Sequence, residues 1–317
     1  MSLSDTSLRE RKTRELNEAD PNAIPETSDP VQSVHRDHST LTWMEIPAWQ
    51  RDNEYILTGY RREQFSWRGC AYSVFGVHLH NETDTPLRST LFVGLLGTFY
   101  QVHLAPYETT AWQDLVVFVI SLSAAIFCLL ASSWYHTFSV HSREVAVRCH
   151  ALDYAGIVVL TVGSFFPCVY YEFYCDTRLQ AAYLSVIVLV GLGAAYIVLD
   201  PEYSKPTHRG ARTKVFIALG LSAVFPVAHG FFVHGLQKLW TEMGFGWLIA
   251  SGALYISGAL LYANRIPERF SPGTFDYFFA SHQIFHVCVV LAALSHYVCV
   301  LTSFEHWHAR AGPFCPS

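Results

Sequence analysis

Residues 113–138 read QDLVVFVISLSAAIFCLLASSWYHTF, and this stretch decides the fold. It contains no charged residue after Asp114. As an α-helix it is long enough to cross the hydrocarbon core of a bilayer, which is about 30 Å thick and needs roughly 20 apolar residues. Its last two turns carry Ser132 and His136. The stretch therefore predicts a transmembrane helix whose final turns introduce polar side chains.

Six further apolar segments of similar character follow one another along the chain, at residues 89–106, 147–171, 179–199, 213–234, 242–263 and 276–302. Of the 317 residues, 51% are hydrophobic and only 15% are charged, whereas about 25% are charged in an average soluble domain. We therefore predict an all-α membrane protein, a bundle of seven transmembrane helices. The net charge of −5 is small, so we expect no nucleic-acid partner.

The distribution of Lys and Arg predicts how the bundle is oriented, because loops rich in these residues stay in the cytosol. Ten of them precede residue 89. The loops after the second, fourth and sixth segments carry eight, whereas the other loops and the C-terminal tail together carry three. We therefore predict that the N-terminus is cytosolic and that the C-terminus, after seven crossings, lies outside.

Four regions follow from this pattern. Residues 1–45 are polar and charged and are predicted to be a disordered cytosolic tail. Residues 46–87 mix aromatic and charged side chains, which is typical of short helices lying against the membrane surface. Residues 88–303 hold the seven-helix domain, and residues 304–317 form a short outer tail.

The eight Cys residues are scattered along the chain without CxxC spacing. Most of them fall in apolar segments, where a Cys acts as a small core residue. Cys175 and Cys315 differ, because the predicted topology puts both near or beyond the outer face of the membrane. These two residues can pair as a disulfide, although spacing alone does not fix the pairing.

A histidine pair lies in the last apolar segment, within Ser281-His282-Gln283-Ile284-Phe285-His286. Residues four apart lie one turn apart on the same helix face. This spacing suits the ligands of a transition metal, but it is not specific, since chance alone gives roughly 0.8 such pairs in a chain with 16 His. A metal site therefore requires ligands from other segments.

Two other segments bring polar side chains to the same cytosolic depth. His136 stands at the cytosolic end of the second segment, and Asp153 stands near the cytosolic start of the third. If the third and seventh helices begin with their apolar segments, Asp153 and His282 each lie about 9 Å inside them. His150 lies one turn before Asp153, so the residues alone leave open whether His136 or His150 completes the metal site.

Three His ligands favour Zn²⁺ with one open position, the pattern of catalytic zinc sites. Zinc lowers the pKa of its bound water to about 7, and Asp153 is placed to accept a proton from that water. Ser132 lies one turn before His136, and its hydroxyl can donate to a developing oxyanion. Both residues also have ordinary alternatives, because Asp153 can cap its helix and Ser132 can bond to its own helix backbone.

The sequence motifs resemble those of the progestin and adipoQ receptor (PAQR) family, which includes adiponectin receptors, haemolysin III proteins and fungal zinc-homeostasis proteins. The motifs are Ser132-x-x-x-His136, Leu152-Asp153-Tyr154-x-Gly156, Gly163-Ser164-Phe165 with Tyr170-Tyr171-x-Phe173-Tyr174-Cys175, and Ser281-His282-Gln283-Ile284-Phe285-His286. The resemblance covers about residues 46–303 and suggests a fungal-type member. It implies seven helices and a cytosolic N-terminus.

The resemblance also implies the ligand set and the chemistry of the site. It implies Zn²⁺ held by His136, His282 and His286 near the inner leaflet, which favours His136 over His150. Asp153 and Ser132 match the family's acidic and hydroxyl residues beside the metal. The family's link to ceramide hydrolysis suggests a zinc-dependent, ceramidase-like lipid amide hydrolase that serves lipid signalling or metal homeostasis.

Such an enzyme would hold a ceramide-like lipid or a free fatty acid inside the bundle. We expect the walls to include Trp134, Tyr135, Phe165, Phe166 and Phe285. The alternative function is a seven-helix receptor or sensor with a purely structural zinc and an extracellular protein ligand. Either protein would be an integral multi-pass protein of the plasma membrane or the endoplasmic reticulum. Transport is less favoured, since we identify no acidic partner for Asp153 in the outer half.

Overall fold

The computed structural model describes residues 40–73, 75, 94, 107, 109–203, 205–309 and 315. Its α-helices are α2 (Trp67–Ser73), α4 (Trp112–Phe138), α5 (Arg143–Glu172), α6 (Thr177–Leu199), α7 (Arg209–Leu221), α8 (Val224–His234), α9 (Leu236–Glu242), α10 (Phe245–Asn264) and α11 (Ser281–His308). In this part of the chain the β-type pairing is a single bridge between Leu41 and Tyr60. The all-α prediction is confirmed for the described residues.

Six stretches of the described chain are long and apolar enough to cross a membrane: Trp112–Phe138, Arg143–Glu172, Thr177–Leu199, Arg209–His234, Phe245–Phe270 and Ser281–His308. They correspond to the second to seventh predicted segments. The first predicted segment, residues 89–106, lies outside the described residues except for Gly94, which is helical.

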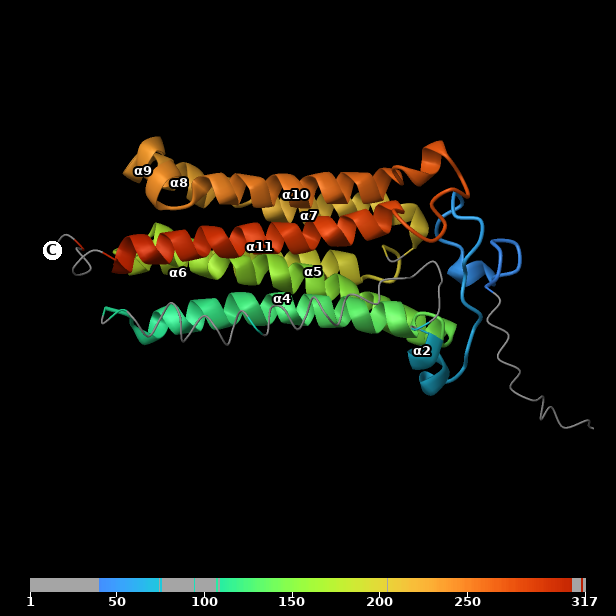
Figure 1. Cartoon of the computed structure of the whole chain (residues 1–317). Helices are drawn as coiled ribbons and strands as arrows, with labels where there is room; N and C mark the ends of the chain where they lie inside the picture. The colour runs from blue at the N-terminus through green and yellow to red at the C-terminus, as the bar shows by residue number, and fades with distance from the viewer. Residues whose placement is uncertain are drawn as a thin grey trace, which may run out of the picture. The chain divides into compact units, whose positions relative to one another are not determined.

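The long helices run side by side, with α4 packed along α5 and α10 packed along α11 (Figure 1). Small residues allow these close approaches, as is usual between helices in a membrane. A Cβ atom added at Gly163 of α5 would lie 2.5 Å from the Cβ of Ala124 in α4. One added at Gly258 of α10 would lie 2.8 Å from the Cβ of Cys288 in α11.

The predicted segment 213–234 is divided in the structure. It forms α7 and α8, with Ser222 and Ala223 between them. Pro226 has no N–H to donate to the carbonyl of Ser222, so a continuous helix would lack this hydrogen bond. The Ser222 carbonyl instead accepts from the backbone N–H of Phe225 at 3.2 Å.

Residues 40–60 fold against the end of the bundle at which α11 begins. Ile46, Ile56 and Tyr60 form a buried cluster with Ala280. Folded structure thus begins before the predicted tail boundary at residue 45, because Leu41 already pairs with Tyr60. Helical structure here is short, namely the 3-10 turn Ala48–Gln50 and helix α2, so the prediction of interfacial helices for 46–87 applies to little of the described segment.

Two buried carboxylates attach this segment to the bundle and set the start of α11. Asp276 accepts hydrogen bonds from the backbone N–H groups of Leu57 and Thr58, at 3.0 and 2.8 Å. Glu268 is completely buried and accepts from the backbone N–H of Ser281 at 2.8 Å and from its hydroxyl. The helix therefore begins at Ser281, after the predicted start at 276.

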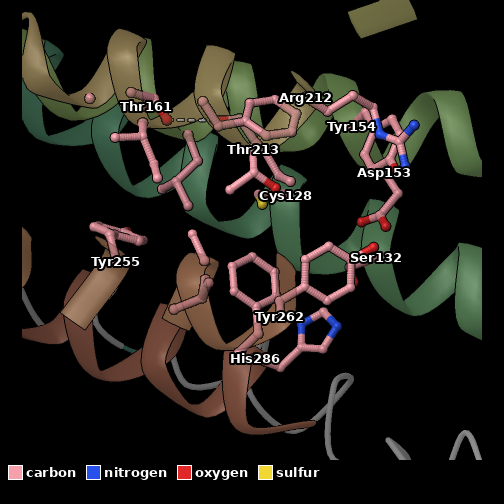
Figure 2. Close-up of a pocket in the computed structure, with 18 of the residues that line it drawn as sticks. Cys128, Ser132, Asp153, Tyr154, Thr161, Arg212, Thr213, Tyr255, Tyr262 and His286 are labelled. Carbon is pink, nitrogen blue, oxygen red and sulfur yellow. Dashed lines mark hydrogen bonds between the residues drawn. The ribbon is translucent and has the colours of Figure 1, made fainter. Parts of the chain in front are cut away.

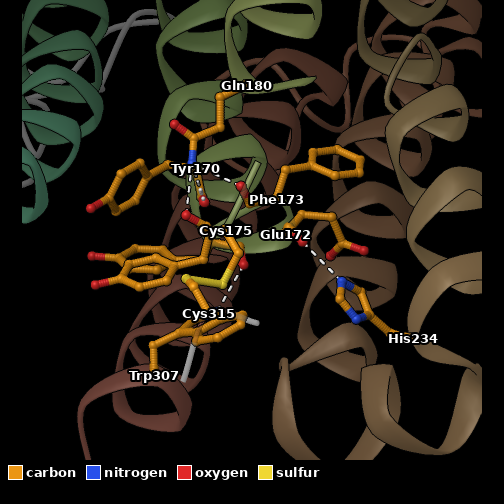
Figure 3. Close-up of a disulfide and its surroundings, with 10 residues drawn as sticks. Tyr170, Glu172, Phe173, Cys175, Gln180, His234, Trp307 and Cys315 are labelled. Carbon is orange, nitrogen blue, oxygen red and sulfur yellow. Dashed lines mark hydrogen bonds between the residues drawn. A yellow bond between two sulfur atoms is a disulfide. The ribbon is translucent and has the colours of Figure 1, made fainter. Parts of the chain in front are cut away.

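At the opposite end, α11 continues through His308, so the predicted outer tail of 304–317 begins too early. Asp114 anchors this end, because it accepts from the Tyr171 hydroxyl at 2.8 Å and lies 3.2 Å from His308 Nε2. Cys175 and Cys315 form a disulfide near Trp307, as Figure 3 shows. The structure thus contains the pairing that the sequence left open.

Glu268→Ala is expected to lower the free energy of unfolding by at least about 1–3 kcal/mol, because it leaves the buried N–H of Ser281 without its acceptor. The measurement is the midpoint of thermal unfolding of the purified protein in detergent. Glu202→Ala is the matched control, since the Glu202 side chain is 60% exposed and pairs with the equally exposed Lys205. Equal midpoints for the two variants would contradict this role of Glu268.

Candidate metal centre

Three histidines from two helices meet at the end of the bundle where α4 ends and α11 begins. One ligand atom from each of His136, His282 and His286 lies within 4.8 Å of the other two. The Nε2 atoms of His136 and His286 are 3.2 Å apart. His282 and His286 stack with ring centroids 4.8 Å apart, as expected for residues one helical turn apart.

This donor set fits a zinc ion. Two nitrogens bound to tetrahedral Zn²⁺ at 2.0–2.1 Å lie about 3.3 Å apart, close to the separation of His136 and His286. His136 and His286 are buried, at 5% and 7% exposure. Neutral imidazoles are suitable ligands for zinc in such a site, and three of them leave one tetrahedral position open.

An arginine from the N-terminal segment holds the ligand-bearing end of α4. The guanidinium of Arg61, which is buried, donates to the carbonyls of His136 and Thr137, at 3.3 Å for the latter. These are among the last carbonyls of α4, and a cation is favourable at the C-terminal end of a helix dipole. Arg61 thus fixes the backbone from which His136 projects.

Packing and capping fix the other two ligands. Glu268 determines where α11 begins, so His282 is the second residue of that helix. Its predicted depth of about 9 Å is wrong, because residues 276–280 form the connection before the helix. The ring of Tyr262 in α10 lies 5.1 Å from the His282 ring and restricts its orientation.

Asp153 and Ser132 lie on the cavity that His282 and His286 also line. Both side chains are buried, at 9% and 4% exposure. Figure 2 shows Asp153 directed into this space from α5, with Ser132 of α4 and His286 of α11 nearby. The Ser132 hydroxyl is buried and makes no hydrogen bond within the described residues.

His150 does not join the histidine cluster. Its ring packs 4.2 Å from Tyr154 and 5.0 Å from Tyr135, measured between centroids. Among the described residues that the structure brings together as possible metal ligands, the third histidine is His136. The geometry therefore favours His136 in the choice that the residues alone left open.

The cavity beside the histidines has a volume of about 1110 Å³ and runs along the bundle between α4, α5, α7, α10 and α11. Of the predicted wall residues, Tyr135, Phe165 and Phe285 line it, but Trp134 and Phe166 do not. Trp134 is 48% exposed, and its ring packs on Phe138 and on Trp67 of α2 instead. These contacts keep its ring away from the cavity.

Several cavity residues were not anticipated. Asp52 binds Arg209 at 2.6 Å and lies 3.5 Å from Arg265. Removal from water opposes its ionisation, but these two guanidinium groups outweigh that effect and lower the pKa of Asp52 below its ordinary value. Arg209 and Arg265 stand next to polar loops in the sequence, and this position did not indicate that their side chains point into the protein.

Glu172 corrects a second expectation. It is the last residue of α5 and lines the far end of the same cavity, so the half of the bundle that is predicted to lie outside does contain an acidic side chain. Its carboxylate lies against the backbone of Gly230, where an added Cβ would be 1.3 Å from Oε1. Proximity to Gly230 depends on the packing of α8 on α5, which the sequence pattern did not predict.

Comparisons with known proteins identify the family of the chain. The model of the haemolysin-III related family matches residues 86–297, a range that includes Asp153 and all three clustered histidines. The ADIPOR-like receptor IZH2 of Saccharomyces cerevisiae is 34% identical over 314 residues, which cover 96% of this chain and 98% of the yeast protein. The adiponectin receptor protein of Drosophila melanogaster is 39% identical over 261 residues, 80% of this chain.

The progestin and adipoQ receptor-like protein 1 of Caenorhabditis elegans is 36% identical over 279 residues, 87% of this chain. The chain spans 63% of the length of this worm protein and 57% of the length of the fly protein. The yeast protein, by contrast, is matched over nearly its whole length. The chain therefore belongs to the haemolysin-III related family and is a PAQR, adiponectin receptor-like membrane protein.

Proposed function

We propose that the protein is a zinc-dependent hydrolase of a lipid amide, with a ceramide-like substrate. One observation carries this proposal: three histidines cluster among the helices, and two of them, His282 and His286, line one cavity together with the buried carboxyl group of Asp153. Purely structural zinc sites are usually closed by four protein ligands. Within the described residues this cluster has three, which leaves a position for water or substrate.

The residues have separate roles in this proposal. His136, His282 and His286 would hold the zinc, which when bound polarises a carbonyl and activates water. Asp153 accepts the proton of the attacking water and later returns it to the leaving amine. Ser132, next to Asp153, donates a hydrogen bond to the oxygen on which negative charge develops.

The cavity explains why the substrate would be a lipid. Beyond the histidines its walls are largely apolar, including Leu129, Ile157, Leu160 and Val289. A volume of about 1110 Å³ accommodates an acyl chain, and an apolar wall favours it by roughly 0.8 kcal/mol per buried CH₂ group. An amide bond near Asp153 would leave its acyl chain along this wall.

We propose further that the histidine end of the bundle faces the cytosol. Lys and Arg concentrate in the N-terminal region and in the loops at that end. The Cys175–Cys315 disulfide lies at the opposite end, and disulfides persist in extracellular or luminal compartments. Both features support a cytosolic N-terminus in the plasma membrane or the endoplasmic reticulum.

A second candidate is a receptor or sensor whose zinc only joins helices. The fly relative is named an adiponectin receptor, and the yeast relative is named an ADIPOR-like receptor. The histidine cluster connects the end of α4 to the start of α11, which suits a structural role. An extracellular protein ligand would then act on this pair of helices.

We expect about one zinc per chain in the purified wild-type protein. His136→Ala and His282→Ala should each reduce the content to near zero, because two remaining ligands bind zinc weakly. Elemental analysis measures the content. His229→Ala is the control, since His229 lies apart from the cluster, with its Nδ1 3.1 Å from the Tyr183 hydroxyl. Wild-type protein without zinc would contradict both candidate functions.

Asp153→Asn should keep its zinc and reduce lipid amide hydrolysis by about 10²–10⁴-fold, the usual contribution of a general base. Fatty-acid release from a panel of ceramides measures the rate. Ser132→Ala should reduce the rate by about 10²–10³-fold if Ser132 stabilises the oxyanion. Ser133→Ala is the control, because Ser133 bonds to the Leu129 carbonyl of its own helix. Full zinc with no hydrolysis by the wild type would favour the receptor.

The proposed orientation predicts which cysteines a reagent outside the cell can reach. After reduction of intact cells, a membrane-impermeant maleimide should label Cys175 and Cys315 without permeabilisation. A cysteine introduced as Glu202→Cys, on the exposed loop between α6 and α7, is the cytosolic control and should be labelled only after permeabilisation. The opposite labelling pattern would reverse the topology.

A further inference from the structure

The end of the cavity nearest the histidines is strongly cationic. The Lys and Arg residues that line the cavity are Arg51, Arg61, Arg143, Lys205, Arg209 and Arg212. All of them lie toward the start of α5, the start of α7 or the N-terminal segment, which is the histidine end. Two carboxylates, Asp52 and Asp153, line the same end. Lys205 is paired with Glu202, but the five arginines alone still outnumber the two acids there.

Arg212 is a buried cation without an ion-pair partner among the described residues. It is 4% exposed, and its Nη1 donates to the carbonyls of Tyr203 and Lys205, at 2.8 Å for Lys205. Its guanidinium lies 4.9 Å from the centroid of the Tyr154 ring. Carbonyls and a ring face offset only part of the cost of burying a full charge.

Arg209 lies one turn before Arg212 and is 8% exposed. It shares the single carboxylate of Asp52 with Arg265, so the three guanidinium groups keep an excess of positive charge. Its Nε–H is buried and makes no hydrogen bond within the part of the chain that the structure describes. Both cavity arginines also stand in the first turn of α7, where the helix dipole adds positive potential.

We propose that Arg209 and Arg212 bind the phosphate monoester headgroup of a lipid whose chain extends into the cavity. Guanidinium groups recognise phosphate oxygens with paired, charge-assisted hydrogen bonds. A phosphate monoester carries about −1.5 to −2 charge at pH 7, which matches the excess left by three arginines and Asp52. The unbonded Nε–H of Arg209 supplies a donor that no described protein group uses.

An aromatic ring connects this headgroup position to the histidines. The ring of Tyr262 lies 5.6 Å from the Arg209 guanidinium and 5.1 Å from the His282 ring. Figure 2 shows Arg212 over Tyr154 and Tyr262 near His286 on the same cavity. A headgroup at the arginines thus lies one ring away from the metal ligands. The substrate class rests on the proposed hydrolase function. If that function holds, the preferred substrates are N-acyl lipids that carry a phosphate.

The cavity favours a lipid over free phosphate as the source of this anion. The arginines lie at one end of a continuous space, and the walls beyond them include Ile157, Leu160 and Phe216. An amphiphile satisfies both regions at once, whereas inorganic phosphate would leave the apolar part unfilled. Both candidate ligands present a phosphate group to the arginines. They differ in that only the lipid has an acyl chain that can bind to the apolar walls.

The test uses the full-length, zinc-loaded protein in detergent, with native mass spectrometry and thermal unfolding as readouts. The probes are oleoyl lysophosphatidic acid, its neutral counterpart monoolein, and inorganic phosphate. We expect lysophosphatidic acid to bind at least about tenfold more tightly than monoolein, corresponding to charge-assisted hydrogen bonds. Equal affinities for the two lipids would overturn the proposal. Stabilisation by inorganic phosphate equal to that by the lipid would overturn its lipid part.

Variants assign the effect to the arginines. Arg212→Gln and Arg209→Gln should weaken lysophosphatidic acid binding by about tenfold or more and leave monoolein binding and zinc content unchanged. Lys214→Gln, which removes an exposed charge on the same helix, should change neither. Unchanged lysophosphatidic acid binding in Arg212→Gln would refute the assignment. If that variant fails to fold, Arg212→Lys, which keeps the charge but loses the planar fork, should show an intermediate loss.

Failure of this inference is separable from failure of the proposed function. Binding that depends on Arg212 and persists in Asp153→Asn supports the headgroup site even if no lipid amide is hydrolysed. Hydrolysis of neutral ceramides at the same rate as phosphorylated ones, with no effect of Arg212→Gln on KM, would retain the hydrolase and overturn the headgroup site.

Discussion

The hydrogen bonds between Glu268 and Ser281 are the constraint on which the site depends. A helix leaves its first N–H groups without partners in the helix. At the start of α11, the completely buried carboxylate of Glu268 accepts hydrogen bonds from the N–H and from the hydroxyl of Ser281. The negative charge also complements the positive end of the α11 dipole. Since His282 follows directly, a shift of this helix start by one residue would rotate both α11 histidines by about 100° away from His136.

The end of α4 is fixed by the complementary arrangement. Arg61 donates to the last carbonyls of that helix, including the carbonyl of His136 itself. An anion thus holds the N-terminus of one helix and a cation holds the C-terminus of the other, each in agreement with the helix dipole. Arg61 belongs to the same N-terminal segment as Asn53, which donates to Glu268 at 3.1 Å. This segment therefore connects the two helix ends that carry the clustered histidines.

The apolar helices and the spacing of His282 and His286 are predictable from the sequence because both depend on local rules, whereas the choice of His136 over His150 rested on the resemblance to the PAQR family. A span is a run of apolar residues, and the α11 ligands are one helical turn apart. Prediction failed where distant parts of the chain decide the outcome. The start of α11 depends on Glu268, and the position of Trp134 outside the cavity depends on its contact with Trp67 in α2. The inward arginines depend on the Asp52 loop, which no periodicity places.

Asp114 and Asp153 show why burial alone does not identify a functional carboxylate. Asp114 has three neighbours that satisfy it: the Tyr171 hydroxyl, the N–H of Ala111 and the ring of His308. Such a network stabilises one packed arrangement and leaves no oxygen for a ligand. Asp153, by contrast, lines a cavity beside the histidines, and the buried Ser132 hydroxyl on the same cavity makes no hydrogen bond within the described part of the chain. In the proposed hydrolase, a carboxyl group without such a network would be available to act as the base.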